Sequence, residues 1–249
     1  MKYKLIGIDP APSKKSVVFD GSGFYAFGFR ELKYYVEFKA EFYQEKLIIA
    51  WDAPLGDCFL SMSQKPIEKI LNTKSSYITN KPPKGISTLP FASCPHWAVS
   101  QYVLGYPLIN KEIINKDKLK FRLIHCEKDF HLSLPKVVET HPAYSLWVYL
   151  KDFLNEGDFA YKKSELSFKK VINKLFEIEY FKKYVRFKDE IMKKGDDYLD
   201  ALICYCNLEL FATQRTKIYG NRKTGAMLLP ALEGILNKKT LKEVKNDKC

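Results

Sequence analysis

The sequence lacks a long apolar run, is modest in glycine and proline, and contains no C-x-x-C motif among its six cysteines. No apolar stretch approaches the ~18 residues of a membrane-spanning helix. The opening stretch, Leu5 to Ile8, stops at Asp9 and is too short for a signal peptide. Glycine and proline number 12 each, too few for a collagen-like or low-complexity chain. The cysteine spacing is wrong for a standard zinc module. We therefore expect a soluble, cytoplasmic protein with no membrane partner.

Positive charge is in excess. The chain has 41 Lys and Arg residues against 29 Asp and Glu residues, which gives a formal net charge of +12. An excess of this size favours polyanionic partners such as nucleic acid, because each neutralised phosphate releases condensed counterions. The alternative is that lysines simply cover solvated helix faces. The lysine pairs at 162–163, 169–170, 182–183 and 193–194, set among acidic and aromatic residues, fit that alternative.

The first part of the chain has the pattern of β-strands. Residues 3–9 are an apolar run of β-formers that ends before a proline, which indicates a buried strand followed by a turn. Residues 16–20 and 24–29 flank a glycine-rich turn and indicate a hairpin. Residues 47–51 form a further compact strand, and we expect a segment at 34–38 to extend or replace one of these strands.

Strands and helices alternate in the second half, which indicates a mixed-sheet α/β domain. A strand is expected at 136–140, followed by helices at 143–154 and 164–176. The clearest helix is 196–211, because Gly195 or Asp196 can cap it and acidic residues fill its first turn.

The domain organisation follows from these patterns. We expect a single domain over residues 1–236, with an inserted irregular region at about 57–133 in which a helix begins near Trp97. A lysine-rich tail occupies residues 237–249 and is expected to fray.

Acidic residues stand out because they lie at the ends of apolar elements. Asp9, Asp52 and Glu139 each close a predicted strand, and Asp200 lies in the late helix with Asp197 one turn before it. The carboxyl ends of parallel strands are where an open α/β sheet places its ligand crevice. If strands 3–9 and 47–51 are parallel neighbours, Asp9 and Asp52 face each other across roughly one ~4.8 Å strand spacing.

Such a gathering of like charges is unfavourable unless a cation screens it. Oxygen ligands without histidine or thiolate suit Mg²⁺ or Mn²⁺. Each residue also has an ordinary role, since Asp9 and Asp52 can cap turns, Glu139 can pair with a lysine, and a first-turn Asp197 can stabilise the helix dipole. Their joint occurrence favours a divalent metal site over these separate roles.

Four motifs, in order, resemble a known family. They are Gly7-Ile8-Asp9, Trp51-Asp52-Ala53-Pro54-Leu55-Gly56, Glu139-Thr140-His141-Pro142 and Asp196-Asp197-Tyr198-Leu199-Asp200-Ala201-Leu202, followed by Leu228-Leu229-Pro230. The set resembles the domain-of-unknown-function family 429 (DUF429), which is described as predicted nucleases with an RNase H-like fold. It is also similar to the Holliday-junction resolvase branch of that fold. The resemblance implies an α/β fold with a mixed five-stranded sheet in the order 3-2-1-4-5 and helices on both faces.

For the site, the resemblance implies catalytic, metal-binding carboxylates at Asp9, Asp52, Asp197 and Asp200, with Glu139 as a further metal ligand. These would hold two Mg²⁺ or Mn²⁺ ions, about 3.5–4 Å apart, for hydrolysis of phosphodiester bonds by a two-metal mechanism.

A nuclease function also bears on partners. Lys14 and Lys15, just past the first strand, would position the phosphate backbone of DNA or RNA. Resolvase relatives dimerise, so a homodimer is possible. Lys65 and Glu68 stand where related sequences tend to carry an arginine and an acidic residue.

Two other functions fit parts of the pattern. An ATP-binding phosphotransferase of the actin-like and sugar-kinase group would share the opening Gly-Ile-Asp. That group uses glycine and threonine after the aspartate to cradle phosphate, whereas prolines at 10 and 12 lack the necessary N–H. A non-catalytic nucleic-acid-binding protein would keep the basic surface without needing the carboxylates.

Overall fold

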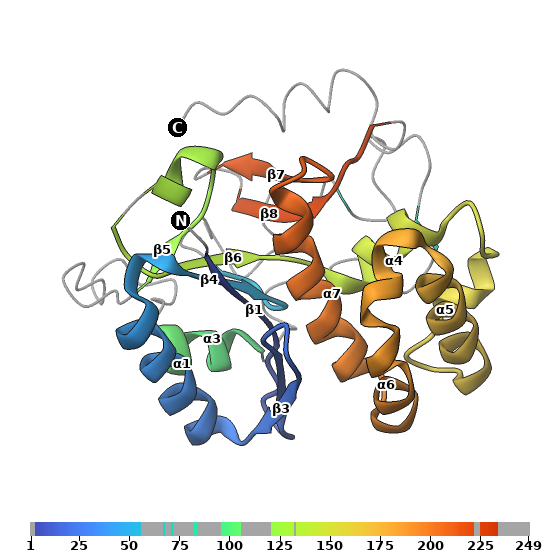
Figure 1. Ribbon diagram of the computed structural model, residues 1–249, viewed down its shortest axis with the longest axis horizontal. Helices are drawn as coiled ribbons and strands as arrows, with labels where there is room; N and C mark the ends of the chain where they lie inside the picture. Colours follow the sequence, from blue (N-terminus) through green and yellow to red (C-terminus); the bar gives the residue numbers. More distant parts are fainter. Residues whose placement is uncertain are drawn as a thin grey trace.

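A six-stranded mixed sheet forms the centre of the protein in the computed structural model, which describes residues 3–55, 67, 71, 82–83, 96–105, 121–131, 133–221 and 225–233. The strand order is β3-β2-β1-β4-β6-β5. β1, β4, β6 and β5 run parallel, whereas β2 and β3 form an antiparallel hairpin beside β1 (Figure 1). The strands are β1 (Lys4–Asp9), β2 (Ser16–Phe19), β3 (Phe24–Phe27), β4 (Leu47–Trp51), β5 (Arg122–Leu123) and β6 (Lys136–Glu139).

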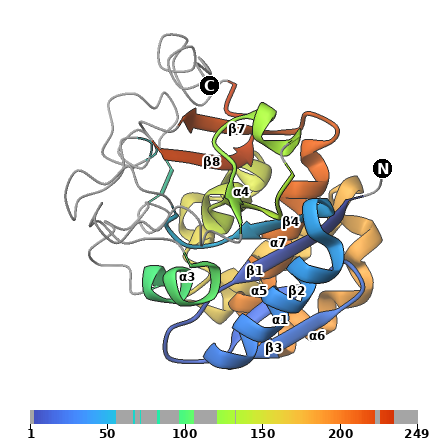
Figure 2. The ribbon, with the colours of Figure 1, turned by 90° about the vertical axis from the view of Figure 1, so that its left-hand side faces the viewer.

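Helices cover both faces of this sheet, as expected. α1 and α3 pack on one face, and α7, with α4, α5 and α6 beyond it, lies on the other (Figures 1 and 2). Across the described ranges, no helix combines the length and the apolar character needed to cross a membrane. The helices are α1 (Phe29–Tyr43), α3 (His96–Leu104), α4 (Pro142–Leu150), α5 (Glu165–Glu177), α6 (Lys188–Lys194) and α7 (Asp196–Phe211).

Shorter elements complete the described chain. A separate two-stranded antiparallel sheet joins β7 (Thr216–Asn221) to β8 (Gly225–Pro230). Among the described residues, a bridge between Thr140, just after β6, and Leu228 of β8 connects it to the main sheet. The 3-10 segments are η1 (Gln44–Lys46), η5 (Glu127–His131), η6 (Glu156–Phe159) and η7 (Glu179–Phe187).

The expected sheet of five strands in the order 3-2-1-4-5 is wrong at its far edge. β6 lies beside β4, and a sixth strand, β5, forms the edge of the sheet beyond β6 although it precedes β6 in the chain. Within the described part of the chain, Arg122 and Leu123 are the residues of β5 that pair with β6. Two residues are too few to leave a period-2 pattern, so this sixth strand has no signal in the sequence.

The expectation of a strand at 34–38 is also wrong, because this segment lies inside α1. Leu32, Val36 and Ala40 are buried at a spacing of four, which is the core-facing period of a helix. The helix start is reinforced where the Gly28 N–H donates to Glu31 Oε2 at 2.7 Å. The helical period therefore outweighs the β preference of the aromatic residues in this run.

Other elements lie where they were expected. The hairpin at Ser16–Phe19 and Phe24–Phe27, the strands β1, β4 and β6, and the helix Asp196–Phe211 are confirmed. α3 begins at His96, next to the predicted start at Trp97. Most of the insertion at 57–133 and all of the tail at 237–249 lie outside the described residues, so the domain boundaries stay a prediction.

α7 lies against β1 more closely than a side chain would allow. A Cβ placed on Gly7 would be 2.3 Å from the Ala201 carbonyl oxygen and 2.4 Å from the Tyr205 nitrogen, both backbone atoms. The thiol of Cys204 donates to the Ile8 carbonyl at 3.6 Å. Glycine at position 7 is therefore what permits direct contact between the helix and strand backbones.

Asn207 ties the middle of α7 to three other elements. Its side-chain Nδ2 donates to Thr140 Oγ1 at 2.8 Å and to Ser145 Oγ at 2.9 Å, and its Oδ1 accepts from Tyr149 Oη at 2.7 Å. Its backbone carbonyl accepts from Thr216 Oγ1 at 2.7 Å. The amide is fully buried and its hydrogen-bonding capacity is used, so this network sets the rotation of α7.

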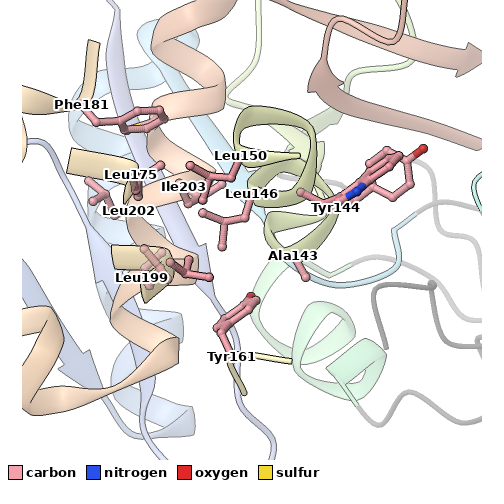
Figure 3. Close-up of a cluster of buried hydrophobic side chains, with 14 of the residues drawn as sticks. Ala143, Tyr144, Leu146, Leu150, Tyr161, Leu175, Phe181, Leu199, Leu202 and Ile203 are labelled. Atoms are coloured by element: carbon pink, nitrogen blue, oxygen red, sulfur yellow. The ribbon is translucent and has the colours of Figure 1, made fainter. Parts of the chain in front are cut away.

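Apolar side chains fill the space between α7 and the outer helices. Figure 3 shows Leu146 and Leu150 of α4 directed toward Ile203 of α7, with Leu175 of α5 beside them. All four are fully buried. This packing leaves the first turn of α7 at one end of the cluster, where Tyr161 lies near Leu199 (Figure 3).

We expect Gly7→Ala to destabilise the fold, because the new methyl group meets backbone atoms that cannot move independently. The loss should be about 1–3 kcal/mol or more, as for overpacking in other cores. Urea unfolding followed by circular dichroism measures it. Gly23→Ala is the control, since nothing lies within 4 Å of a Cβ there. Equal midpoints for the two variants would contradict the close approach.

Candidate metal centre

The carboxyl ends of three adjacent parallel strands meet at one edge of the sheet. Ile8 lies beside Trp51, and Trp51 lies beside Glu139. The Asp52 N–H donates to the Ile8 carbonyl at 3.0 Å, which continues the pairing past the end of β4. Asp9 and Asp52 are therefore on neighbouring parallel strands, as the sequence predicted.

The first two turns of α7 bring Asp197 and Asp200 to the same place. Gly195 forms the N-cap with φ 103°, a conformation that favours glycine, and the helix begins at Asp196. Asp200 is fully buried and Asp9 is nearly so, whereas the Asp197 side chain is partly exposed. Because α7 contacts β1 at Gly7, Asp200 lies on the face of the sheet toward which Asp9 points.

The carboxyl groups affect one another. Burial raises the pKa of Asp9 well above its ordinary value, and the charges of Asp52 and Asp200 raise it further. Burial likewise raises the pKa of Asp52 to about 8, opposed by Lys162 and assisted by Asp200. Burial is also the main cause of the raised pKa of Asp200. Burial and neighbouring negative charge both disfavour the ionised carboxyl group, which is why the three shifts have the same direction.

Lys162 supplies the positive charge among these carboxylates. Its Nζ lies 2.5 Å from Asp200 Oδ2, although the side chain of this lysine is almost half exposed. Burial lowers the pKa of Lys162, but Asp200, Tyr161, Asp52 and Asp9 more than offset this and raise it well above the ordinary value. The ammonium group is therefore the cation that balances the buried aspartates.

Tyr161 orients the other oxygen of Asp200. The Tyr161 hydroxyl donates to Asp200 Oδ1 at 2.8 Å, and both side chains are buried. Asp200 Oδ2, by contrast, makes the ion pair with Lys162 but accepts no hydrogen bond of good geometry among the described residues. Asp200 Oδ1 is thus held by a hydrogen bond, whereas Oδ2 faces the positive charge of Lys162.

Glu139 faces away from this group. Side chains alternate along a strand, and the register aligns Glu139 with Trp51 and Ile8, so Glu139 lies on the face opposite to Asp9. Its Oε2 accepts from the Leu55 N–H at 2.6 Å. Glu139 therefore holds the loop that follows β4, and its charge also raises the pKa of Asp52.

The two lysines predicted to bind substrate differ in their contacts. Lys14 Nζ lies 2.7 Å from Asp197 Oδ1 and 2.6 Å from Asp197 Oδ2, at the exposed rim of the centre. Lys15, next in the chain, is exposed. Lys65 and Glu68 lie outside the described residues.

Two histidines lie close enough to the centre to feel its charges. Burial lowers the pKa of His96, and Lys162 and Lys14 lower it further against the effect of Asp197. Burial and then Lys162 lower the pKa of His141 to about 3. Both imidazoles are therefore neutral near pH 7, and the charge of the centre is carried by aspartates and lysines.

The donor set fits Mg²⁺ or Mn²⁺, but the conformation does not present a ready ligand shell. Among the described residues, no three His, Cys, Asp or Glu side chains are placed so that they could hold one metal ion. The carboxylates nevertheless provide hard oxygen ligands. In addition, the buried Asp200 Oδ2 is held only by an ion pair. Binding a divalent ion at Asp200 would require Lys162 to leave.

Comparison with known proteins identified no relative of this chain. No protein-family model matches the chain, and no curated protein and no solved structure matches it.

Sequence reasoning missed Tyr161 and Lys162. Lys162 belongs to one of the lysine pairs that resemble a solvated helix face, and Tyr161 is one of 16 tyrosines. Neither stands at a strand end or in a motif. An aromatic residue followed by lysine has no distinctive pattern, so the sequence contains no signal for their position beside Asp200.

The raised carboxyl pKa values predict a pH-dependent stability. A carboxyl group with a higher pKa in the folded than in the unfolded chain binds its proton more tightly when folded, so stability falls as pH rises. For Asp52 the window runs from about 4, the ordinary aspartate pKa, to about 8. Without metal, the free energy of unfolding should therefore fall across this window, and we expect it to fall less for Asp52→Asn than for the wild type. Urea unfolding in the presence of a chelator at several pH values measures this difference.

The exposed Asp152 gives the matched control, since Asp152→Asn should leave the pH dependence of the wild type unchanged. If the free energy of unfolding of Asp52→Asn depends on pH as that of the wild type does, Asp52 does not have a raised pKa in the folded protein.

Proposed function

We propose that the protein is a metal-dependent nuclease with an RNase H-like fold, related to the DUF429 family. The observation that carries the proposal is the convergence of Asp9, Asp52 and Asp200 from two strand ends and one helix around Lys162. Asp9 and Asp200 are buried, and the mutual repulsion of the three carboxylates is unfavourable for folding alone. A bound divalent cation would screen this repulsion.

The arrangement of the sheet supports the fold part of the proposal. The order β3-β2-β1-β4, with β2 antiparallel to β1 and β4 parallel to it, agrees with the first four positions expected from the resemblance. The helix that carries Asp197 and Asp200 then packs on β1, beside the strand that ends in Asp9.

In this proposal, Asp9, Asp52 and Asp200 would hold Mg²⁺ or Mn²⁺, and Asp197 would complete the set at the rim. When bound, such ions activate water and stabilise the leaving oxygen of a phosphodiester. Lys14 and Lys162 are the basic groups at the rim, with side chains 60% and 46% exposed. They are placed to contact the phosphates of DNA or RNA, and the net charge of +12 favours the same partner.

We expect Asp9→Asn and Asp200→Asn each to abolish Mn²⁺-dependent cleavage of nucleic acid, with a loss of at least roughly 10³-fold in rate, because each removes a charge that the metal requires. The asparagine at 200 can still accept the Tyr161 hydrogen bond, so the fold should persist. Cleavage of labelled single-stranded, duplex and branched DNA and RNA measures the effect, with Asp152→Asn as the control.

Three outcomes would contradict this function. The wild type could cleave none of these substrates with either ion. It could bind ATP tightly in a Mg²⁺-dependent manner, as a phosphotransferase would. Finally, salt-sensitive nucleic-acid binding without cleavage that survives Asp9→Asn and Asp200→Asn would indicate a non-catalytic binding protein.

Lys162 gives a separate test of metal binding. If its ammonium group must leave Asp200 before a metal binds, Lys162→Gln should tighten Mn²⁺ binding by roughly tenfold, since a charge-assisted contact contributes about 1.5–3 kcal/mol. Isothermal titration calorimetry measures the dissociation constant. Lys163→Gln, at the exposed neighbouring position, is the control. Unchanged or weaker Mn²⁺ binding by Lys162→Gln would show that the lysine does not compete with the ion.

A further inference from the structure

A single turn between η6 and α5 contacts both oxygens of the Asp200 carboxylate. Tyr161 and Lys162 are consecutive residues of this turn. The Tyr161 hydroxyl donates to Asp200 Oδ1 at 2.8 Å, and Lys162 Nζ lies 2.5 Å from Oδ2. Because Asp200 is fully buried, these two contacts decide which of its oxygens another group can reach.

The contact at Oδ1 is part of the core. Tyr161 is 4% exposed, and its ring belongs to the apolar cluster that contains Leu199 (Figure 3). The turn itself is closed by a hydrogen bond from the Lys163 N–H to the Ala160 carbonyl at 2.9 Å. Moving the hydroxyl away from Asp200 would therefore require the close packing around the ring to change.

The contact at Oδ2 is removable. The Lys162 side chain is 46% exposed, and its flexible stem allows the ammonium group to move into water without disturbing the core. Asp200 Oδ2 is itself buried and accepts no hydrogen bond within the described part of the chain. The two oxygens therefore differ, because Oδ1 keeps its partner whereas Oδ2 becomes free when the lysine leaves.

This difference restricts how the carboxylate can bind a cation. A hydroxyl at 2.8 Å occupies space beside Oδ1 and withdraws charge from it, so a cation is bound better through Oδ2 alone. Mg²⁺ and Mn²⁺ prefer octahedral sets of oxygen ligands, whereas Ca²⁺ takes more oxygens and accepts both oxygens of one carboxylate. A carboxylate restricted to one oxygen therefore favours the smaller ions.

We propose that Tyr161 is a positioning residue for the metal centre: by holding Asp200 Oδ1, it makes Asp200 a monodentate ligand through Oδ2 and thereby selects Mg²⁺ or Mn²⁺ against Ca²⁺. The inference rests on the proposed function, because it requires Asp200 to bind a divalent cation. It assigns the choice of ion to a neighbouring turn and not to the carboxylate itself.

Isothermal titration calorimetry of the full chain, with Mn²⁺ and separately with Ca²⁺, tests this selection. We expect the wild type to bind Mn²⁺ more tightly than Ca²⁺. Tyr161→Phe should lower the ratio of the Mn²⁺ to the Ca²⁺ association constant by roughly tenfold, the scale of a hydrogen bond to a charged group. The freed Oδ1 allows Ca²⁺ to bind both oxygens, from which Mn²⁺ gains less.

Tyr184→Phe is the matched control. The Tyr184 hydroxyl also donates to a carboxylate of α7, Glu209 Oε2 at 2.6 Å, and its ring is similarly buried. Removing this hydroxyl should change the stability of the fold and leave the ratio of the two association constants as in the wild type. A purely structural role of Tyr161 would likewise shift both constants together.

Infrared spectroscopy of the wild type gives a second measurement, which decides the question even if Tyr161→Phe unfolds. A bidentate carboxylate shows a smaller separation between its antisymmetric and symmetric stretches than a monodentate one. In the Mn²⁺-loaded protein, we expect the bands that disappear in Asp200→Asn to have the wide separation of a monodentate ligand.

The proposal fails in three cases. If Tyr161→Phe leaves the ratio unchanged while Asp200→Asn abolishes Mn²⁺ binding, the proposed metal centre stands and the role of Tyr161 is wrong. If the infrared bands show a bidentate Asp200 in the Mn²⁺-loaded wild type, the same conclusion follows. If Mn²⁺ binding by the wild type does not depend on Asp200, the proposed function is contradicted as well.

Discussion

The contact between the backbones of α7 and β1 is the constraint on which the candidate centre depends. Gly7 allows the helix to approach until the Ala201 carbonyl and the Tyr205 nitrogen occupy the space of a missing side chain. At this separation Asp200, one residue before Ala201, is buried on the face to which Asp9 points. The Asn207 network fixes the rotation of the same helix farther along. The position of Asp200 is thus a consequence of packing around a glycine and a buried amide.

The same contact creates an electrostatic problem that Lys162 solves within the chain. Two strand-end aspartates and a helical one lie in a poorly solvated region, where their pKa values rise. An ammonium group 2.5 Å from Asp200 balances part of this charge. A single lysine cannot neutralise three carboxylates, so the region remains destabilising as pH rises unless a further cation binds. The aspartates that lower the stability of the fold are therefore the same residues that are proposed to bind metal.

Periodicity predicted the long, regular elements and failed for short or ambiguous ones. α7 was predictable because capping, a first acidic turn and an apolar body agree over sixteen residues. α1 was not, since its aromatic residues favour strands while its buried Leu32, Val36 and Ala40 follow a helical period. β5 has two residues and pairs only through the sheet, so its existence depends on tertiary contact. Tyr34 and Phe38, at the two ends of the segment expected to be a strand, are exposed on α1.

The sequence by itself determined which acidic residues end strands and begin α7, because strand ends and helix caps depend on neighbouring residues. The parallel pairing of β1 with β4 then placed Asp9 beside Asp52, as predicted. Only the tertiary structure decided that Glu139 points to the other face and that Tyr161 and Lys162 contact Asp200. The direction of a side chain at a strand end depends on register, and a contact across 38 residues depends on helix packing, neither of which is a local property of the chain.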